Sequence, residues 1–200
     1  MKQVSKILIA TQNDGKLREI QAELADLDLK LVCLGDFDPL PEAVESGSTF
    51  AENADLKALH YCDLSGLWAL ADDSGLDVDA LDSRPGVFSA RYAGPDADDD
   101  RNNTKLLAEL ANVPEPKRTA RFRCAMTLAA DGKIIARSQG TIEGRITFDY
   151  QGQNGFGYDP LFYVSEKGCT TAQMAPKEKN AISHRGQAIR AMKQLLLKLL

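Results

Sequence analysis

Short apolar runs alternate with helical patterns through the first third of the chain. Three of these runs are typical of buried strands: residues 6–10 (KILIA), 29–35 (LKLVCLG) and 67–73 (LWALADD). Residues 15–27 carry leucine and isoleucine at helical spacing, and Thr49 with Glu52 forms the capping signature of a helix that ends near residue 63. Strands and helices mixed in this order indicate an α/β fold.

The second half of the chain predicts one more helix, then adjoining strands and a final helix. In order, we expect a helix over 98–113, strands over 118–130, 133–147 and 161–164, and a helix from about residue 177 or 183 to the end. Asp131 and Gly132 form a tight turn between two of these strands, which indicates a meander of antiparallel strands. The whole pattern predicts a single α/β domain on a mixed sheet.

Composition restricts the class of protein further. The 200 residues are 44% hydrophobic with a net charge of -5, which suits one globular domain and gives no footprint for nucleic acid or a membrane surface. The four cysteines are far apart in the sequence, so we expect reduced thiols and no structural zinc. The apolar run near the N-terminus is too short for a signal peptide, and we therefore expect a soluble cytoplasmic protein.

A polar loop follows the first predicted strand and leads into the first predicted helix. Its residues are Thr11, Gln12, Asn13, Asp14, Gly15 and Lys16. Free backbone N–H groups at a helix N-terminus and the charge of Lys16 favour a bound phosphate, although the loop lacks the Walker A spacing. The alternative is an ordinary Asn-Asp-Gly turn with a solvated lysine.

Two adjacent carboxylates, Asp72 and Asp73, come at the end of the third predicted strand. Successive side chains of a strand point to opposite faces, so the two cannot aim at the same point. The carboxyl end of a strand in an α/β sheet is where ligands bind, and Mg²⁺ prefers oxygen ligands of this kind. The alternative is an Asx-type turn in which Ser74 and Gly75 break the strand.

Three further charged residues precede or follow the Thr49 cap. Glu42 and Glu45 lie in an acidic loop, and Lys57 lies two turns into the following helix. Glu45 could complete a metal site and Lys57 could reach a phosphate. Since most surface Glu and Lys side chains are merely solvated, these residues carry little weight without further support.

The loop NGFGYDP, residues 154–160, brackets Phe156 between Gly155 and Gly157. Such a loop brings the backbone close to a ligand and offers an aromatic face to a base, but a hairpin or bulge with a buried Phe is the alternative. Near the last helix, Lys179, His184 and Arg185 form a donor-rich cationic cluster. We expect the His184-Arg185 pair to lie outside the core, and we assign the other histidine, His60, to structure.

Six segments together give the sequence a family resemblance. TQNDGK, FAENADLKA, ADDSGL, PGVFSARYAG, GFGYDP and EKNAISHRGQA, in this order, closely resemble the non-canonical purine nucleoside triphosphate pyrophosphatases, the inosine/xanthosine triphosphate pyrophosphatase family. The resemblance spans residues 6–195 and implies one pyrophosphatase domain over 1–200. It implies a long mixed sheet flanked by helices, in two lobes with a central cleft, and a homodimer. Gln12 departs from the bacterial pattern, which has Gly at this position.

The resemblance also implies roles for individual residues. Asp73 would be the general base and a Mg²⁺ ligand, and Glu45 would be a second Mg²⁺ ligand. The residues implied to bind substrate are Thr11 to Lys16 and Lys57 for the triphosphate, and Phe156, Gly157, Tyr158, Asp159, Lys179, His184 and Arg185 for the base and sugar. Ser74 would also contact the substrate. Donors such as Arg185 and His184 would pair with the 6-oxo group of inosine or xanthosine and reject the 6-amino group of ATP.

The chemistry implied is hydrolysis between the α- and β-phosphates, with release of a nucleoside monophosphate and pyrophosphate. Such a reaction needs charge neutralisation and a positioned water, which Mg²⁺, lysines and a carboxylate can supply. Three alternatives stay open: a related pyrophosphatase with another base preference, a phosphomonoesterase that uses Asp73 as nucleophile, and a nucleotide-binding module without turnover.

Overall fold

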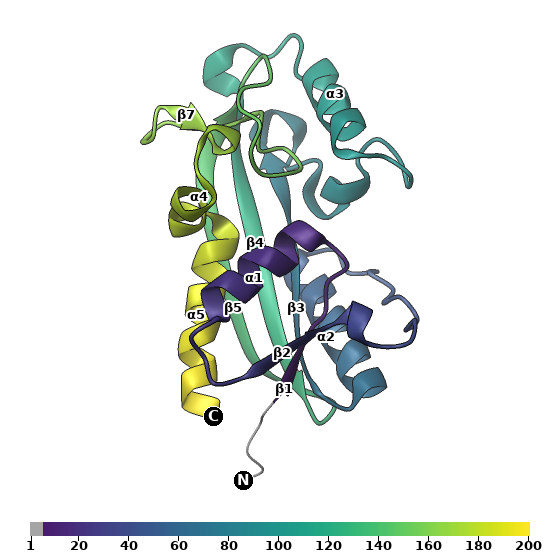
Figure 1. Ribbon diagram of the computed structural model, residues 1–200. Coiled ribbons are helices and arrows are strands. Elements are labelled where there is room, and N and C mark those ends of the chain that lie inside the picture. Colours follow the sequence, from purple (N-terminus) through teal and green to yellow (C-terminus); the bar gives the residue numbers. More distant parts are fainter. Residues whose placement is uncertain (1–5) are drawn as a thin grey trace. The chain divides into compact units, whose positions relative to one another are not determined.

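The computed structural model describes residues 6–200 (Figure 1). The strands are β1 (Lys6–Ile9), β2 (Lys30–Cys33), β3 (Trp68–Val78), β4 (Thr119–Ala130), β5 (Lys133–Ile146), β6 (Phe162–Val164) and β7 (Cys169–Thr170). The α-helices are α1 (Asp14–Leu24), α2 (Phe50–Ser65), α3 (Asp99–Glu109), α4 (Pro176–Ile182) and α5 (His184–Leu199).

The strands form one sheet in the order β2-β1-β3-β4-β5-β6-β7. β1 pairs in parallel with β2 and β3, whereas β6 pairs antiparallel with β5 and β7. Asp131 and Gly132 have φ angles of 49° and 70°, which is the conformation that a tight hairpin turn between β4 and β5 requires. The predicted α/β fold on a mixed sheet and the predicted meander are therefore confirmed.

One predicted element boundary is wrong. β3 does not end at the aspartate pair but continues through Ser74 and Gly75 to Val78. The Asx-type turn at Ser74 and Gly75, which was the alternative, is absent. The backbone of β3 stays extended there, as a strand between β1 and β4. For the final helix, expected to start at about residue 177 or 183, the second start is confirmed. α5 begins at His184, and Ser183, with an extended ψ of 154°, separates it from α4.

The chain divides into two compact units. The first unit contains residues 1–73, 124–140 and 185–200, and the second unit contains residues 74–123 and 141–184. Each unit has apolar clusters of its own. The prediction of a single domain and that of a central cleft stay predictions.

The sheet of the first unit is covered by helices on both faces. On one face Leu70 packs with Ile20 of α1 and Ile189 of α5. On the other face Ala71 packs with Ala58 of α2. Figure 1 shows α1 and α5 beside the strands of this unit. Adjacent residues of β3 thus face different helices, as the period of two in a strand requires.

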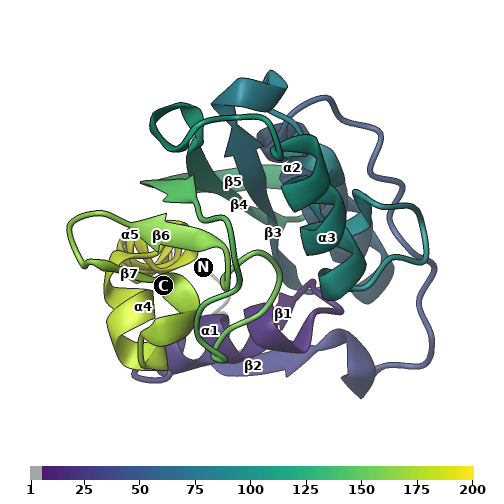
Figure 2. The same cartoon turned by 90° about the horizontal axis from the view of Figure 1, so that it is seen from above.

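The second unit has one apolar core, in which Leu76, Leu106 of α3, Phe122 and Phe162 are buried. The Phe122 and Phe162 rings lie 4.5 Å apart between centroids. β6, β7 and α4 lie together in this unit, as Figure 2 shows from above. This unit holds the loop that carries Phe156 and the helix that carries Lys179.

All four cysteines lie within the described residues, and each carries a free thiol, as predicted. No helix within residues 6–200 is long and apolar enough to cross a membrane.

Candidate active site

Asp72 and Asp73 lie in the middle of β3 and their side chains contact different helices. Asp72 shares the face of Leu70, and Lys16 of α1 lies 3.1 Å from its Oδ2 atom. Asp73 shares the face of Ala71, and Asn53 of α2 donates a hydrogen bond to its Oδ2 atom at 3.0 Å. The predicted divergence of the two side chains is confirmed.

Asp72 is a buried anion with cations on its own side of the sheet. Besides Lys16, the Nε atom of Arg185 lies 3.4 Å from Asp72 Oδ2, and Arg185 Nη1 lies 2.6 Å from Glu19 Oε2. Burial of the Asp72 carboxyl opposes its ionisation, but the charges of Lys16 and Arg185 outweigh burial and hold its pKa well below the ordinary value. Asp72 is therefore an ionised group at neutral pH that keeps Lys16 and Arg185 in place.

The loop before α1 is fixed by its own side chains. Asn13 caps the helix, since its Oδ1 atom accepts a hydrogen bond from the Lys16 backbone N–H at 3.0 Å. Thr11 Oγ1 accepts a hydrogen bond from the Asn13 backbone N–H at 3.2 Å, while Gln12 and Asp14 are exposed. The ordinary Asn-Asp-Gly turn of the alternative reading is not what the structure has, because Asn13 is the N-cap and Asp14 and Gly15 begin α1. Its solvated lysine is also wrong, because Lys16 contacts Asp72.

Asp73 belongs to a second charged cluster, formed with α2 and the loop before it. Lys57 Nζ lies 3.1 Å from Glu45 Oε1 and 3.7 Å from Asp73 Oδ1. Burial raises the pKa of Asp73, and the charge of Lys57 partly offsets this. Burial lowers the pKa of Lys57, but the neighbouring carboxylates outweigh burial and raise it. Lys57 and Glu45 are thus part of a built cluster, in contrast to the solvated side chains of the alternative.

The donor set of this cluster fits a hard cation. Oxygens of Glu45 and Asp73 converge on one positive charge, that of Lys57. Among residues 6–200 no group of three or more His, Cys, Asp or Glu side chains could hold a metal ion. Mg²⁺ commonly binds through one or two carboxylates and completes its shell with water and phosphate oxygens, so a pair of carboxylates is sufficient.

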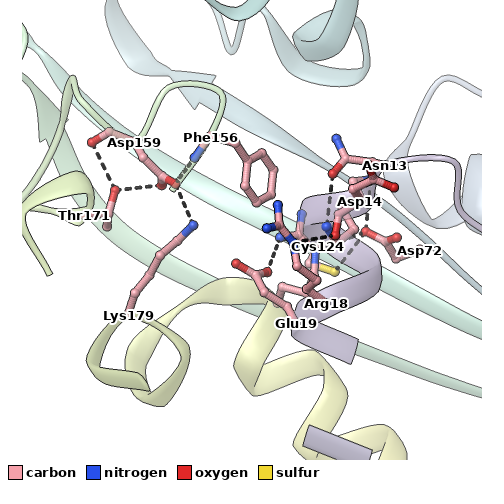
Figure 3. Close-up of polar contacts among 12 residues, drawn as sticks. Asn13, Asp14, Arg18, Glu19, Asp72, Cys124, Phe156, Asp159, Thr171 and Lys179 are labelled. Carbon is pink, nitrogen blue, oxygen red and sulfur yellow. Dashed lines mark hydrogen bonds and ion pairs between the residues drawn. The ribbon is translucent and has the colours of Figure 1, made fainter. Parts of the chain in front are cut away.

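In the second unit, Asp159 is the centre of a buried network. Its carboxylate accepts hydrogen bonds from Lys179 Nζ at 2.6 Å, the Phe156 backbone N–H at 2.9 Å and Thr171 Oγ1 at 2.8 Å (Figure 3). Lys179 Nζ also lies 4.7 Å from the centroid of the Phe156 ring. Asp159 therefore fixes both the backbone of Phe156 and the cation beside its ring.

The next two residues of this loop are held by the rest of the second unit. Asp99 Oδ2 accepts a hydrogen bond from the Gly157 backbone N–H at 2.6 Å, and Asn103 Nδ2 donates to the Gly157 carbonyl at 2.9 Å. The buried Tyr158 donates its hydroxyl to the Ser89 carbonyl at 2.8 Å. The alternative reading of a loop with a buried Phe is not what the structure has, since Phe156 is only half-buried and Tyr158 is buried.

The expectation that His184 and Arg185 lie outside the core is wrong. His184 is 5% exposed and Arg185 is 2% exposed. The His184 ring stacks on Phe122, with centroids 4.9 Å apart and an interplanar angle of 14°. Arg185 is stabilised inside the first unit by Asp72 and Glu19, and such pairing is what permits a buried guanidinium. Ser74, the remaining predicted residue, is half-buried within β3.

Gly155 is required by the Asp159 network, because a Cβ atom there would lie 2.0 Å from Asp159 Oδ2 and the φ angle is +79°. Gly155→Ala is therefore expected to displace Asp159 and to lower the free energy of unfolding by about 3 kcal/mol. Gly66→Ala is the matched control, since Gly66 has a φ of +65° with no atom within 4 Å of its Cβ position. The control should cost about 1 kcal/mol, measured by urea unfolding, and equal losses would contradict the role of the clash.

Sequence reasoning missed two residues of the first unit that complete these clusters. Glu19 lies one helical turn after Lys16 and pairs with Arg185, and Asn53 lies one turn before Lys57 and pairs with Asp73. Helical spacing from each lysine would have placed Glu19 and Asn53 on the same helix faces. Sequence reasoning also missed Asp99 and Asn103, for which no local signal exists.

These features define a class of protein: an α/β protein with a mixed sheet, in which the interior strand β3 carries two buried aspartates, each against a lysine from a different helix. A model of the Ham1 family matches residues 7–195. The chain belongs to the Ham1 family.

Curated relatives and solved structures agree with this assignment. The chain is 51% identical to a dITP/XTP pyrophosphatase of Geobacter sulfurreducens, over 96% of this chain and 97% of the relative. It is 49% identical to a dITP/XTP pyrophosphatase of Exiguobacterium sibiricum, over 96% of each. The solved structure of a HAM1 protein from Coxiella burnetii is 44% identical, covers 98% of this chain and 100% of its own, and superposes with a TM-score of 0.89.

Proposed function

We propose that this protein hydrolyses non-canonical purine nucleoside triphosphates, namely ITP, dITP and XTP, to the monophosphate and pyrophosphate. The observation that carries the proposal is the 51% identity, over nearly the whole chain, to a relative named dITP/XTP pyrophosphatase. The charged clusters on β3 supply chemistry suited to this reaction. The biological role would be to remove deaminated purines from the nucleotide pool.

Asp73 is proposed as the general base. Its carboxylate is buried and is oriented by the Asn53 amide, so it can accept a proton from a water held next to the phosphate. Because burial raises the pKa of Asp73, its carboxylate is a somewhat better base than an ordinary one. No covalent bond to the protein is needed, since an in-line attack of water requires positioning and charge stabilisation.

Two lysines are proposed to bind the triphosphate. Lys57 and Lys16 each sit against an aspartate of β3, which holds their ammonium groups in fixed positions before a nucleotide binds. Residues Thr11 to Gly15, before and at the start of α1, would complete this part of the site. Within them the backbone N–H groups of Gln12, Asp14 and Gly15 would bind phosphate, as helix N-termini do, since the Asn13 N–H donates to Thr11 Oγ1. Fixed donors of this kind stabilise developing charge without reorganisation.

Mg²⁺ is proposed as the cofactor, with Glu45 and Asp73 as its protein ligands. When bound, it would neutralise triphosphate charge and lower the pKa of water. Removing metal with EDTA is expected to abolish pyrophosphate release, and adding Mg²⁺ in excess should restore it. Activity that survives EDTA treatment and dialysis would contradict this prediction.

The remaining proposed assignments concern the base and the sugar. Phe156 would stack on the base, and Gly157, Tyr158 and Asp159 would shape the loop that carries it. Lys179, His184 and Arg185 are proposed to donate hydrogen bonds to the base and the sugar. Ser74 is proposed as a further substrate contact.

A homodimer and a cytoplasmic location are also proposed. The free state of the four thiols supports a reducing compartment, and the family resemblance supports the dimer. Light scattering of the purified protein should give about twice the mass of one 21.8 kDa chain. A single-chain mass would overturn the dimer.

The test of the function is product analysis with ITP, XTP, GTP and ATP in parallel, with Mg²⁺ and separate detection of pyrophosphate and orthophosphate. We expect pyrophosphate and a monophosphate from ITP and XTP, and little product from GTP or ATP. Orthophosphate as the first product would indicate a phosphatase. Preference for GTP or a pyrimidine would indicate a related pyrophosphatase, and binding without turnover would indicate a nucleotide-binding module.

A further inference from the structure

Asn53 of α2 contacts Asp73, one proposed metal ligand, and the loop that carries the other, Glu45. The side chain is 0% exposed and bonds in two directions. Its Nδ2 atom donates to Asp73 Oδ2 at 3.0 Å, and its Oδ1 atom accepts from the Gly47 backbone N–H at 2.8 Å. Gly47 lies two residues after Glu45, in the same loop. One amide thus links Asp73 to the loop that carries Glu45.

The orientation of the Asn53 amide follows from its partners. A backbone N–H can only donate and an ionised carboxylate can only accept, so the amide oxygen must face Gly47 and the amide nitrogen must face Asp73. Aspartate, with no amide donor, could satisfy Gly47 only. Leucine, of similar size, could satisfy neither partner.

The loop has no room to move closer to α2. A Cβ atom at Gly47 would lie 2.6 Å from Glu52 Cβ and 2.7 Å from Asn53 Oδ1. The contacts form a closed path. Asn53 connects Asp73 to the loop that carries Glu45, and Lys57 connects Glu45 back to Asp73, since its Nζ atom lies 3.1 Å from Glu45 and 3.7 Å from Asp73. Closed networks of satisfied buried groups are rigid.

We propose that Asn53 is a positioning residue for turnover, which fixes the Asp73 carboxylate and the Glu45 loop relative to each other. This inference rests on the proposed function, because it assigns Asn53 a part in the pyrophosphatase reaction. Asn53 touches no reacting atom in this proposal and acts through Asp73 and through the loop. Side chains that orient metal ligands and bases in this way typically change activity by about 10- to 100-fold when replaced.

The experiment compares Asn53→Leu and Asn53→Asp with the wild type, measuring kcat and KM for ITP with Mg²⁺. Both variants lose the donor to Asp73, so both should lose about 10- to 100-fold in kcat with little change in KM. Amide hydrogen exchange at Gly47 should accelerate in Asn53→Leu and remain slow in Asn53→Asp, which keeps the acceptor. In an Asp73→Asn background, Asn53→Leu should cause no further loss of kcat.

Asn102→Leu is the matched control. Asn102 is also a buried asparagine that bridges two backbone groups, the Ala90 carbonyl at 3.1 Å and the Ala93 N–H at 2.8 Å, and it contacts no proposed ligand. It should lose stability comparably but keep kcat. Equal kcat values for the Asn53 and Asn102 variants would overturn the positioning role.

Failure of the proposed function has a different signature. A wild-type protein that releases no pyrophosphate from ITP or XTP would overturn the proposed function itself and with it the part of Asn53 in that reaction. Unchanged Gly47 exchange in Asn53→Leu would overturn the coupling of the loop, whatever the activity of the wild type.

Discussion

Asp73→Asn is expected to reduce turnover of ITP by about 10²- to 10⁴-fold, which is the usual contribution of a general base. The asparagine side chain has the same size and can still accept the hydrogen bond that Asn53 donates at 3.0 Å. It can neither take a proton from water nor carry the charge of a metal ligand. We therefore expect the fold to persist, and the nucleotide to bind through Lys16 and Lys57 with affinity near that of the wild type.

The measurement combines pyrophosphate release with calorimetric binding of ITP. Asp77→Asn is the control on the same strand, because Asp77 is also buried and its charged neighbour, Arg123, is 3.4 Å away. The control should retain turnover. Equal turnover in Asp73→Asn and wild type would remove Asp73 from its proposed role, whereas loss of binding together with turnover would indicate that the variant disrupts the nucleotide site.

Arg185→Ala is expected to lower the free energy of unfolding by about 3–5 kcal/mol. The guanidinium is buried and lies 2.6 Å from Glu19 and 3.4 Å from Asp72. Its removal leaves Asp72 with one cation fewer in a site where burial already opposes ionisation, and breaking a buried pair from one side has this cost. Urea unfolding followed by circular dichroism measures the change.

Arg137→Ala is the control, since Arg137 also pairs with an aspartate of the same unit, at 2.8 Å from Asp55, but its side chain is 57% exposed. An exposed pair of this kind should contribute less than about 1 kcal/mol. If the two variants lost the same free energy of unfolding, burial would not be the reason for the contribution of Arg185 to stability. Because Arg185→Ala is expected to perturb the fold, base preference is better tested with Arg185→Lys, which keeps the charge.

Much of the fold could be predicted because the signals are local. The Thr49–Glu52 capping box is present as predicted at the start of α2, and the Asp131-Gly132 turn joins β4 to β5. Both depend on hydrogen bonds or dihedral angles within a few residues. The end of β3 was predicted wrongly because Ser74 and Gly75 favour turns in isolation, whereas pairing within the sheet keeps them extended.

The candidate site was predictable residue by residue but not in its contacts. The sequence shows lysines at 16 and 57 and carboxylates at 45, 72 and 73, but it does not say which lysine meets which carboxylate. The residue type alone does not show whether a charged side chain is buried or exposed to solvent. The burial of Arg185 could not be foreseen, since it depends on Glu19 and Asp72, both distant in the chain.

The sequence by itself determined that Asp72 and Asp73 point to opposite faces, since the period of two is a property of one strand. It also determined where α2 begins, by the Thr49–Glu52 capping box. Only the tertiary structure decided what those faces meet: Lys16 and Arg185 on one, Lys57 and Asn53 on the other. The reason is that charge pairs in the interior form between segments brought together by apolar packing, which no local pattern encodes.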